Sequence, residues 1–427
     1  MNNTATFRLT KLALTLSVIG LGMSSHAVYN LYTKDGLSLD INGQIDMQAT
    51  NQDAKHHILN DGDGEDWHSD GGVSPVETPK DATDKQTRLG QNQGVSYVEF
   101  RASQKLPNDW RTTANIGLGY SDSRNMYLSN SSLSIDKKGI GAVSLGRQYL
   151  HTNYVNRTGT DTPLDIFSTS ALRLDYYGQK GLHASAYYSF SGVNDVRKDD
   201  NSGIKSGYGA SLSYRYPIKA DHSVRFGLGY SQKEANPAYT PIVLNSGGNR
   251  VDFGWINNTL NQHPAQTQSV AGSVEYQVGK LLVAADIGRK KETFSKDEKT
   301  PLDTKTSDYL GAKVAYDINP IFQVSAGHGI KKASTQLKKG AKPLSTDLRT
   351  LDPNDPKQYY SYVDGDETHL FDNADTKESY VQLDYRVRPN VRLYTRYDIE
   401  ETTFKVASKD ISRLSDKNVR AGLVFTF

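Results

Sequence analysis

Two adjacent histidines are the residues whose chemistry is easiest to name. His56 and His57 precede the acidic stretch 60–70, and imidazole and carboxylate groups both bind metal ions. Adjacent histidines in a polar loop of this composition are more often simply exposed to water, so we expect no metal site. The chain also contains no nucleophile elbow, no HExxH sequence and no phosphate-binding loop. We therefore expect no cofactor and no catalytic centre.

Arginines on the polar side of alternating segments are the second group that could act on a solute. Four of them lie away from the segment ends: Arg101, Arg173, Arg396 and Arg420. Together they could form a basic wall that attracts anions. Carboxylates lie two residues away from three of them, at Glu99, Asp175 and Asp398, so simple pairing is equally compatible with the sequence.

Strict alternation of apolar and polar residues is the pattern that must position these side chains. At the C-terminus one face of a segment is apolar up to the last residue: Val419, Ala421, Leu423, Phe425 and Phe427. A terminal aromatic is unusual, because the ends of soluble domains tend to be polar and frayed. In a transmembrane barrel the two faces meet lipid and lumen. A half-buried strand of a soluble sandwich is the alternative for this segment alone.

The N-terminus distinguishes these alternatives. Residues 1–27 contain Arg8 and Lys11, an apolar run over 12–22, and small residues up to Ala27. This order is typical of a cleaved secretory signal peptide, so we expect the mature domain to comprise residues 28–427. No later stretch has the roughly 18 consecutive apolar residues of a membrane-spanning helix.

Composition excludes several classes of protein. Loss of Arg8 and Lys11 with the leader leaves 48 basic against 48 acidic side chains, a balance that gives no support for a nucleic-acid partner. The absence of cysteine excludes a secreted domain stabilised by disulfides. A mean hydropathy of −0.62 argues against a helical membrane protein, whereas a barrel needs apolar residues only at alternate positions.

Alternating segments recur along the whole chain and predict sixteen strands. Their ranges are 37–50, 95–106, 110–120, 128–136, 141–150, 172–177, 182–191, 207–216, 223–231, 268–277, 281–291, 308–316, 321–332, 378–387, 391–403 and 417–427. Short and long connections alternate between them, and all 14 prolines fall outside them, as expected because proline cannot donate to a ladder. The pattern predicts an all-β, antiparallel up-and-down transmembrane barrel with tight turns at one rim and long loops at the other.

Several motifs, in this order, resemble the general-diffusion porins of the Gram-negative outer membrane. They are the sequences at 29–36, 39–46, 100–106 and 139–149, and the terminal Val-Phe-Thr-Phe at 424–427. The resemblance implies a homotrimer in outer-membrane lipid. It also implies a third external loop, at 151–171, that folds into the lumen. Phe427 would end the signal that is read by the barrel-assembly machinery.

In that family acidic residues of the third loop face a ladder of basic side chains. The resemblance makes Asp161 and Asp165 the candidates at the constriction, although both could be solvated loop carboxylates beside Pro163. The matching ladder positions hold Gln44, Tyr97 and Ser129, so the basic ladder is not carried over. The four arginines named above are the candidates to replace it.

The resemblance therefore implies a water-filled channel through which ions and small hydrophilic solutes diffuse. A channel specific for one solute would show a track of inward-facing aromatics. The inward tyrosines, among them Tyr97, Tyr187, Tyr380 and Tyr394, lie on scattered segments. An outer-membrane enzyme built on a smaller barrel is a further alternative, and a soluble exported adhesin would leave Phe427 unexplained. The sequence identifies no partner for the long loops 51–94 and 333–377.

Arg147 shares the apolar face of its segment with Val143, Leu145 and Tyr149. Facing lipid at mid-depth would cost about 2–4 kcal/mol, a cost that a neighbouring subunit would remove. The resemblance suggests a latching second loop, where Asp122 is the only carboxylate of residues 121–127. We predict that Arg147→Ala lowers the melting temperature of the trimer, measured by heating folded protein before electrophoresis; unchanged melting would contradict this subunit contact.

Overall fold

The structure is a computed structural model that describes residues 28–58, 81–91, 96–120, 126–165, 167–190, 204–235, 264–294, 302–337, 373–406 and 409–427. The predicted signal peptide, residues 1–27, and Asp122 lie outside these ranges. Within them the chain forms one antiparallel sheet of eighteen strands and a single short 3-10 helix. Among the described residues no helix is long and apolar enough to cross a membrane.

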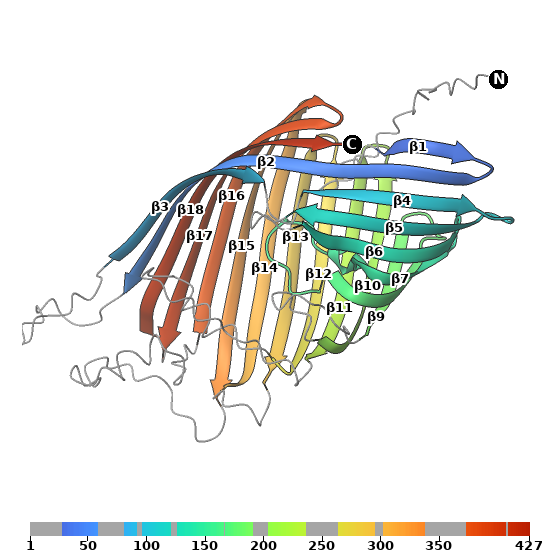
Figure 1. The fold of residues 1–427 in the computed structure, drawn as a ribbon. Helices are drawn as coiled ribbons and strands as arrows, with labels where there is room; N and C mark the ends of the chain where they lie inside the picture. Colours follow the sequence, from blue (N-terminus) through green and yellow to red (C-terminus); the bar gives the residue numbers. More distant parts are fainter. Residues whose placement is uncertain are drawn as a thin grey trace, which may run out of the picture.

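The elements follow one another in the order β1 (Tyr29–Lys34), β2 (Leu37–Ile58), β3 (Asp81–Gln91), β4 (Tyr97–Lys105), β5 (Trp110–Tyr120), β6 (Met126–Lys137), β7 (Gly141–Tyr149), η1 (His151–Tyr154), β8 (Phe167–Tyr176), β9 (Leu182–Ser189), β10 (Ile204–Lys219), β11 (His222–Ala235), β12 (Gln266–Val278), β13 (Leu281–Thr293), β14 (Leu302–Asn319), β15 (Phe322–Leu337), β16 (Asn373–Arg388), β17 (Val391–Val406) and β18 (Lys409–Thr426). Each strand from β4 to β17 pairs with the next one in sequence (Figure 1).

The sheet closes on itself through β2. One edge of β2 pairs with β18, from Gln44↔Thr426 to Ile58↔Ser412, and the other edge pairs with β4. The closed ring therefore contains β2 and β4–β18, and the predicted sixteen-stranded antiparallel barrel is confirmed. Closure leaves no long strand edge unpaired, which a barrel needs where no water can satisfy its backbone.

Two strands are additional to the ring. β1 folds back on the start of β2 along the edge that β18 occupies further on. β3 pairs with the outer half of β2, beyond the part that pairs with β4. The prediction of a loop over 51–94 was therefore wrong for the residues of β2 and β3, because both faces of these extensions are polar and alternation does not reveal them.

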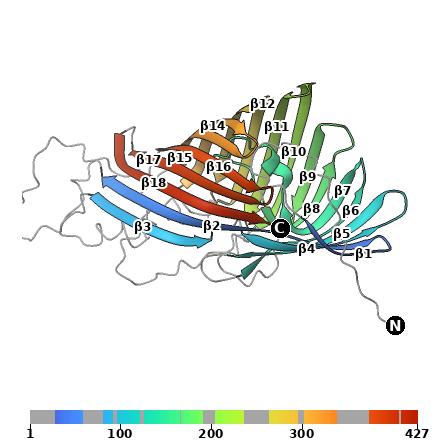
Figure 2. The same ribbon diagram turned by 90° about the horizontal axis from the view of Figure 1, so that it is seen from above.

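Strand lengths differ between the two sides of the barrel. β4–β9 contain 8–12 residues, whereas β10–β18 and β2 contain 13–22. About 9–11 residues suffice for a tilted strand to span the hydrocarbon layer, so only the second group extends well beyond it. Figures 1 and 2 show this tall wall opposite the short strands. The predicted loop 404–416 is likewise largely strand, in β17 and β18.

Pro217 is a third correction to the prediction from sequence. It was expected in a connection but lies within β10, where it pairs with Ser223. The register shifts between Pro217 and Lys219, which places the proline at an irregularity near the strand end. Proline is tolerated there because it interrupts few ladder hydrogen bonds.

The two faces of the barrel differ in chemistry, on the short strands as well as on the tall wall of β10–β18 and β2. Outward-facing side chains are apolar and uncovered: Leu133 and Ile287 are each 65% exposed. The opposite face carries small polar residues, including the buried Ser185, Ser211 and Ser269. This is the division that lipid outside and water inside require.

The C-terminal residue completes the ring at a glycine. The backbone N–H of Phe427 donates to the carbonyl of Gly43 (3.0 Å), and the N–H of Gly43 donates to the carbonyl of Phe427 (2.7 Å). A Cβ added to Gly43 would lie 2.5 Å from the Phe427 ring and 2.7 Å from the Tyr97 carbonyl oxygen. The position therefore accepts only glycine without displacement of the terminus.

We predict that Gly43→Val lowers the melting temperature of the folded barrel, because the side chain must displace the terminal strand or a neighbouring carbonyl. Circular dichroism during heating measures the effect. Gly90→Val is the matched control, since a Cβ at Gly90 meets no atom within 4 Å. Equal melting of the two variants would show that Phe427 does not contribute to closure in this way.

Candidate functional site

Residues 150–165, called the 150–165 segment below, lie against the polar face of the wall. Val155 and Leu164 are buried with Ala271 of β12, and both lie over Gly229 of β11, where an added Cβ would be 2.6 Å from Leu164 and 3.0 Å from Val155. The apolar side chains of Val155 and Leu164 can pack here because Gly229 has no side chain.

Two further glycines, on β13 and β14, extend the surface that the segment packs against; this surface is called the seat below. A Cβ added to Gly288 of β13 would lie 2.6 Å from Pro163, and one added to Gly311 of β14 would lie 2.4 Å from the Thr160 hydroxyl. Distances under 3 Å are not reached by real Cβ atoms. The segment therefore fits a path of glycines, and its position depends on them.

A single carboxylate fixes the middle of the segment. Asp286 of β13 accepts the backbone N–H of Arg157 (2.9 Å), the N–H of Thr158 (2.8 Å) and the Thr158 hydroxyl (2.7 Å). Hydrogen bonds to a charged group stabilise by about 1.5–3 kcal/mol each. Asp286 is therefore the strongest polar anchor between the segment and the wall.

The two acidic residues predicted at the constriction are both in contact with lysines. Asp161 Oδ2 lies 3.3 Å from Lys331 Nζ, and Asp165 Oδ1 lies 2.9 Å from Lys233 Nζ. The Asp161 side chain is 65% exposed, so this pair is worth at most about 1 kcal/mol. The N–H of Asp161 also donates to Glu378 of β16 (2.9 Å).

Beside Asp161 the wall carries carboxylates that the sequence analysis missed. Glu378, Glu400 and Asp416 are register partners on β16, β17 and β18. A cavity of about 140 Å³ between the wall and the segment is lined by residues that include Asp161, Lys331, Glu378 and Glu400. Alternation places each carboxylate on the polar face, but only the strand register shows that the three lie side by side.

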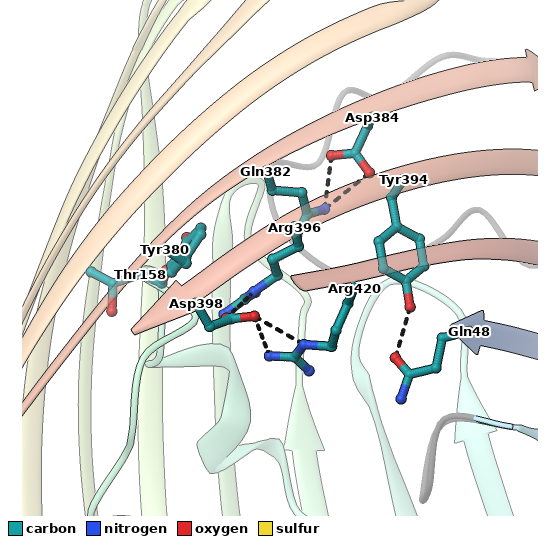
Figure 3. A network of polar contacts seen from close by, with 9 residues as sticks. All are labelled: Gln48, Thr158, Tyr380, Gln382, Asp384, Tyr394, Arg396, Asp398 and Arg420. Atoms are coloured by element: carbon teal, nitrogen blue, oxygen red, sulfur yellow. Dashed lines mark hydrogen bonds and ion pairs between the residues drawn. The ribbon is translucent and has the colours of Figure 1, made fainter. Parts of the chain in front are cut away.

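Two of the predicted arginines, Arg396 of β17 and Arg420 of β18, meet at one carboxylate, as Figure 3 shows. Arg396 Nε lies 2.5 Å from Asp398 Oδ1, and Arg420 Nη2 lies 2.6 Å from Asp398 Oδ2. Two guanidinium groups thus share one carboxylate, which leaves the cluster one positive charge. Both arginines contact the same carboxylate, and whether they act as a basic wall toward a solute stays a prediction.

This arginine cluster is linked to the segment. The Arg396 guanidinium lies 4.0 Å from the centre of the Tyr380 ring, a cation–π contact. The Tyr380 hydroxyl donates to the carbonyl of Thr158 (2.9 Å). Arg396, Tyr380 and Thr158 therefore form a continuous connection between wall and segment (Figure 3).

The other two arginines lie elsewhere. Arg101 contacts Glu99 (3.1 Å), and Arg173 contacts Asp175 (2.9 Å). Arg101 is in register with Asp40 of β2, but Arg420 is in register with Thr50, ten residues further along the same strand. At 3.3 Å per residue the separation along β2 is about 33 Å. Arg101 and Arg420 are therefore too far apart to form one basic wall together.

The family's ladder positions carry no replacement charge. Gln44 and Ser129 are buried. Nearby, the hydroxyl of Tyr394 on β17 lies 3.2 Å from Asp46 Oδ1 and 3.1 Å from Gln48 Oε1, both on β2. The basic side chains Arg396 and Arg420 lie instead on β17 and β18.

The remaining predicted residues lie away from this region. Arg147 is on the outer face, 5.1 Å from the centre of the Phe167 ring, and its predicted partner Asp122 is outside the described residues. His56 and His57 belong to β2 by their backbones, but their side chains are not described. Among the described residues no group of three His, Asp or Glu side chains is arranged to hold a metal ion.

Burial within the segment alters the ionisation of its own groups. Arg157 is 6% exposed, and burial, followed by the nearby charge of Arg225, lowers the Arg157 pKa to about 10. Burial raises the pKa of the Tyr154 hydroxyl above its ordinary value. Arg157 remains charged at neutral pH, although it lacks the hydration of an exposed guanidinium.

Comparison with known proteins gives a consistent picture. Residues 12–336 match the family of Gram-negative porins. No curated protein sequence matches the chain.

Solved structures that resemble the chain include three outer-membrane proteins. The loop-deletion mutant OmpTdeltaL8 of Vibrio cholerae has a TM-score of 0.56 and 15% identity, over 92% of this chain and 100% of that one. The anion-selective porin from Comamonas acidovorans has a TM-score of 0.53 and 11% identity, over 92% and 100%. Salmonella typhi OmpF, in complex with daunomycin, has a TM-score of 0.52 and 13% identity, over 93% and 100%. At these identities the likeness concerns the fold.

We predict that Asp286→Asn releases the middle of the 150–165 segment, because a neutral amide replaces a charged acceptor of three hydrogen bonds. Loss of about 1.5–3 kcal/mol corresponds to amide hydrogen exchange at Arg157 and Thr158 that is roughly 10- to 150-fold faster. Asp384→Asn is the control, since Asp384 is likewise a hydrogen-bonded carboxylate of the polar face but contacts Gln382 and Arg392. Unchanged exchange in Asp286→Asn would rule out the carboxylate as an anchor.

Proposed function

The chain belongs to the Gram-negative porins and forms an outer-membrane channel for diffusion of small solutes; we propose that the 150–165 segment narrows this channel and selects what passes. The observation that carries the proposal is the set of contacts that hold the segment to the wall. Its residues contact every strand from β10 to β16. A segment bound to so many consecutive strands crosses a large part of the barrel's inner circumference.

Opposed charges would set the selectivity at this level. Asp161 projects from the segment, while Arg396 and Arg420 share Asp398 on the wall. A field across a narrow wet passage orients dipolar, hydrated solutes and disfavours apolar ones, which must give up aligned water. We infer that ions and small hydrophilic molecules pass without a tightly bound intermediate.

A homotrimer in outer-membrane lipid is the assembly that we propose. OmpT of Vibrio cholerae, which resembles this chain with a TM-score of 0.54, is described in a trimer form. The short strands β4–β9 and the outward Arg147 form the side that we assign to subunit contact. We also propose that residues 1–27 direct export and that Phe427 is recognised by the barrel-assembly machinery.

The inward tyrosines favour a diffusion channel over one specific for a single solute. Tyr380 and Tyr394 are buried, and their hydroxyls bind protein groups. Tyr187 is buried beside Leu150 and Ala171. Rings that are occupied in this way form no free track for a sugar. We propose no enzymatic activity, because the described polar contacts join the segment to the wall and form no arrangement of nucleophile and base.

Planar-bilayer recordings of the purified, folded protein test this function. We expect stepwise openings in threes, little block by neutral solutes, and a reversal potential in a salt gradient that reports the net selectivity. Gly311→Val should lower the conductance, because its side chain pushes Thr158 and Thr160 away from the wall and into the passage.

Gly272→Val is the matched control for Gly311→Val. Gly272 has open space on the outer face, with no other atom nearer than 3.8 Å to an added Cβ. Equal conductance of both variants would contradict a narrowing role of the segment. Saturable block by one sugar or peptide would favour a specific channel, and a folded but silent barrel would contradict a pore.

A further inference from the structure

Four cationic side chains lie beside one another on the 150–165 segment and along one row of the wall from β10 to β14. Arg215 of β10 is the register partner of Arg225 of β11, which in turn faces Glu275 of β12. Arg157 of the segment donates from Nη2 to Ser213, two residues before Arg215 (3.0 Å). Lys313 of β14 continues the same row, one strand beyond Ala284, the register partner of Glu275.

These cations are incompletely neutralised. Arg225 Nη1 lies 3.5 Å from Glu275 Oε1, a long distance for an ion pair. Among the described residues no carboxylate lies within 4.0 Å of the charged groups of Arg157, Arg215 or Lys313. The nearby Asp286 is occupied by the segment's backbone and the Thr158 hydroxyl. Like charges at directly opposed positions, as at Arg215 and Arg225, destabilise a sheet.

Unused polar atoms in the same place provide an independent observation. Arg157 is more than nine-tenths buried, and its Nε has no hydrogen-bond partner among the described residues. Ser273 Oγ and one oxygen of Glu275 also lack partners there. A buried donor without a partner costs free energy that a suitable acceptor would recover. A planar carboxylate or a phosphate matches the fork of a guanidinium group.

We propose that Arg157, Arg215, Arg225 and Lys313 form a binding site for the carboxylate or phosphate group of a small anionic solute. The site lies between the 150–165 segment and the short turn that joins β10 to β11. A solute therefore reaches it directly before or directly after the proposed narrowing, depending on the direction in which it crosses the channel. Glu275 stands in the same row and opposes the anion, which keeps the site weak enough for the solute to leave. This inference rests on the proposed channel and adds a solute class to it.

Isothermal titration calorimetry tests the site. The folded protein in detergent is titrated with succinate and, in a separate experiment, with inorganic phosphate. The variant Arg215→Gln/Lys313→Gln removes two cations that have no carboxylate within 4.0 Å among the described residues, so it breaks no described ion pair. We expect binding to weaken about tenfold or more, the loss of one or two charge-assisted hydrogen bonds. The ratio of the two affinities shows whether the site prefers carboxylate or phosphate.

Lys332→Gln/Lys377→Gln is the matched control, because it removes two exposed cations from β15 and β16. These positions share the outward parity of Ile330 and Val381, so the control changes net charge equally without changing the lumen. Equal binding by both double variants and the unaltered protein, or no binding by the unaltered protein, would overturn the site.

Bilayer recordings separate failure of the site from failure of the channel. Block by succinate or phosphate that disappears only in Arg215→Gln/Lys313→Gln supports the site within a conducting pore. Conductance that neither anion affects would overturn the site and leave the channel intact. Calorimetric binding in a barrel that does not conduct would contradict the channel and leave the anion site intact.

Discussion

The structure depends on the rule that every backbone N–H and C=O inside a membrane must be satisfied by the protein itself. A sheet meets this rule only by closing, and here closure falls on β2, which pairs with β18 along one edge and with β4 along the other. Ring closure then forces alternate side chains inward. The same alternation that gives lipid an apolar surface therefore supplies the polar residues of the lumen, and no separate signal is needed to direct them there.

Most of the fold could be predicted because alternation is a local property. Sixteen segments with one apolar face, separated by alternating short and long connections, determine an up-and-down barrel. Prediction failed where the local pattern is absent. The outer halves of β2, β3 and β18 have water on both sides, so Asp53, Lys85 and Lys417 occupy outward positions and remove the alternation. Pro217 was misplaced because an irregular register at a strand end tolerates proline.

The site was less predictable because it is assembled by register and by contacts between distant parts of the chain. Thr158 and Asp286 are separated by 128 residues, and Tyr380 and Thr158 by 222. Parity placed Arg396 and Arg420 inward, but only the pairing of β17 with β18 brings both onto Asp398. The registers of β18 and β4 on β2 separate Arg101 from them. The anchor Asp286 and the cations around Arg157 have no motif by which a sequence could identify them.

The seat of the 150–165 segment consists largely of missing side chains. Gly229, Gly288 and Gly311 leave the space that Leu164, Pro163 and Thr160 fill. Residues on both sides of this contact must consequently change together over evolutionary time, although between 65 and 151 positions separate them in the chain. A glycine that acquires a side chain demands a smaller partner, and a smaller partner opens a void that a wall residue can then fill. The position of the segment is therefore encoded by matched pairs of residues, and neither residue of a pair specifies it alone.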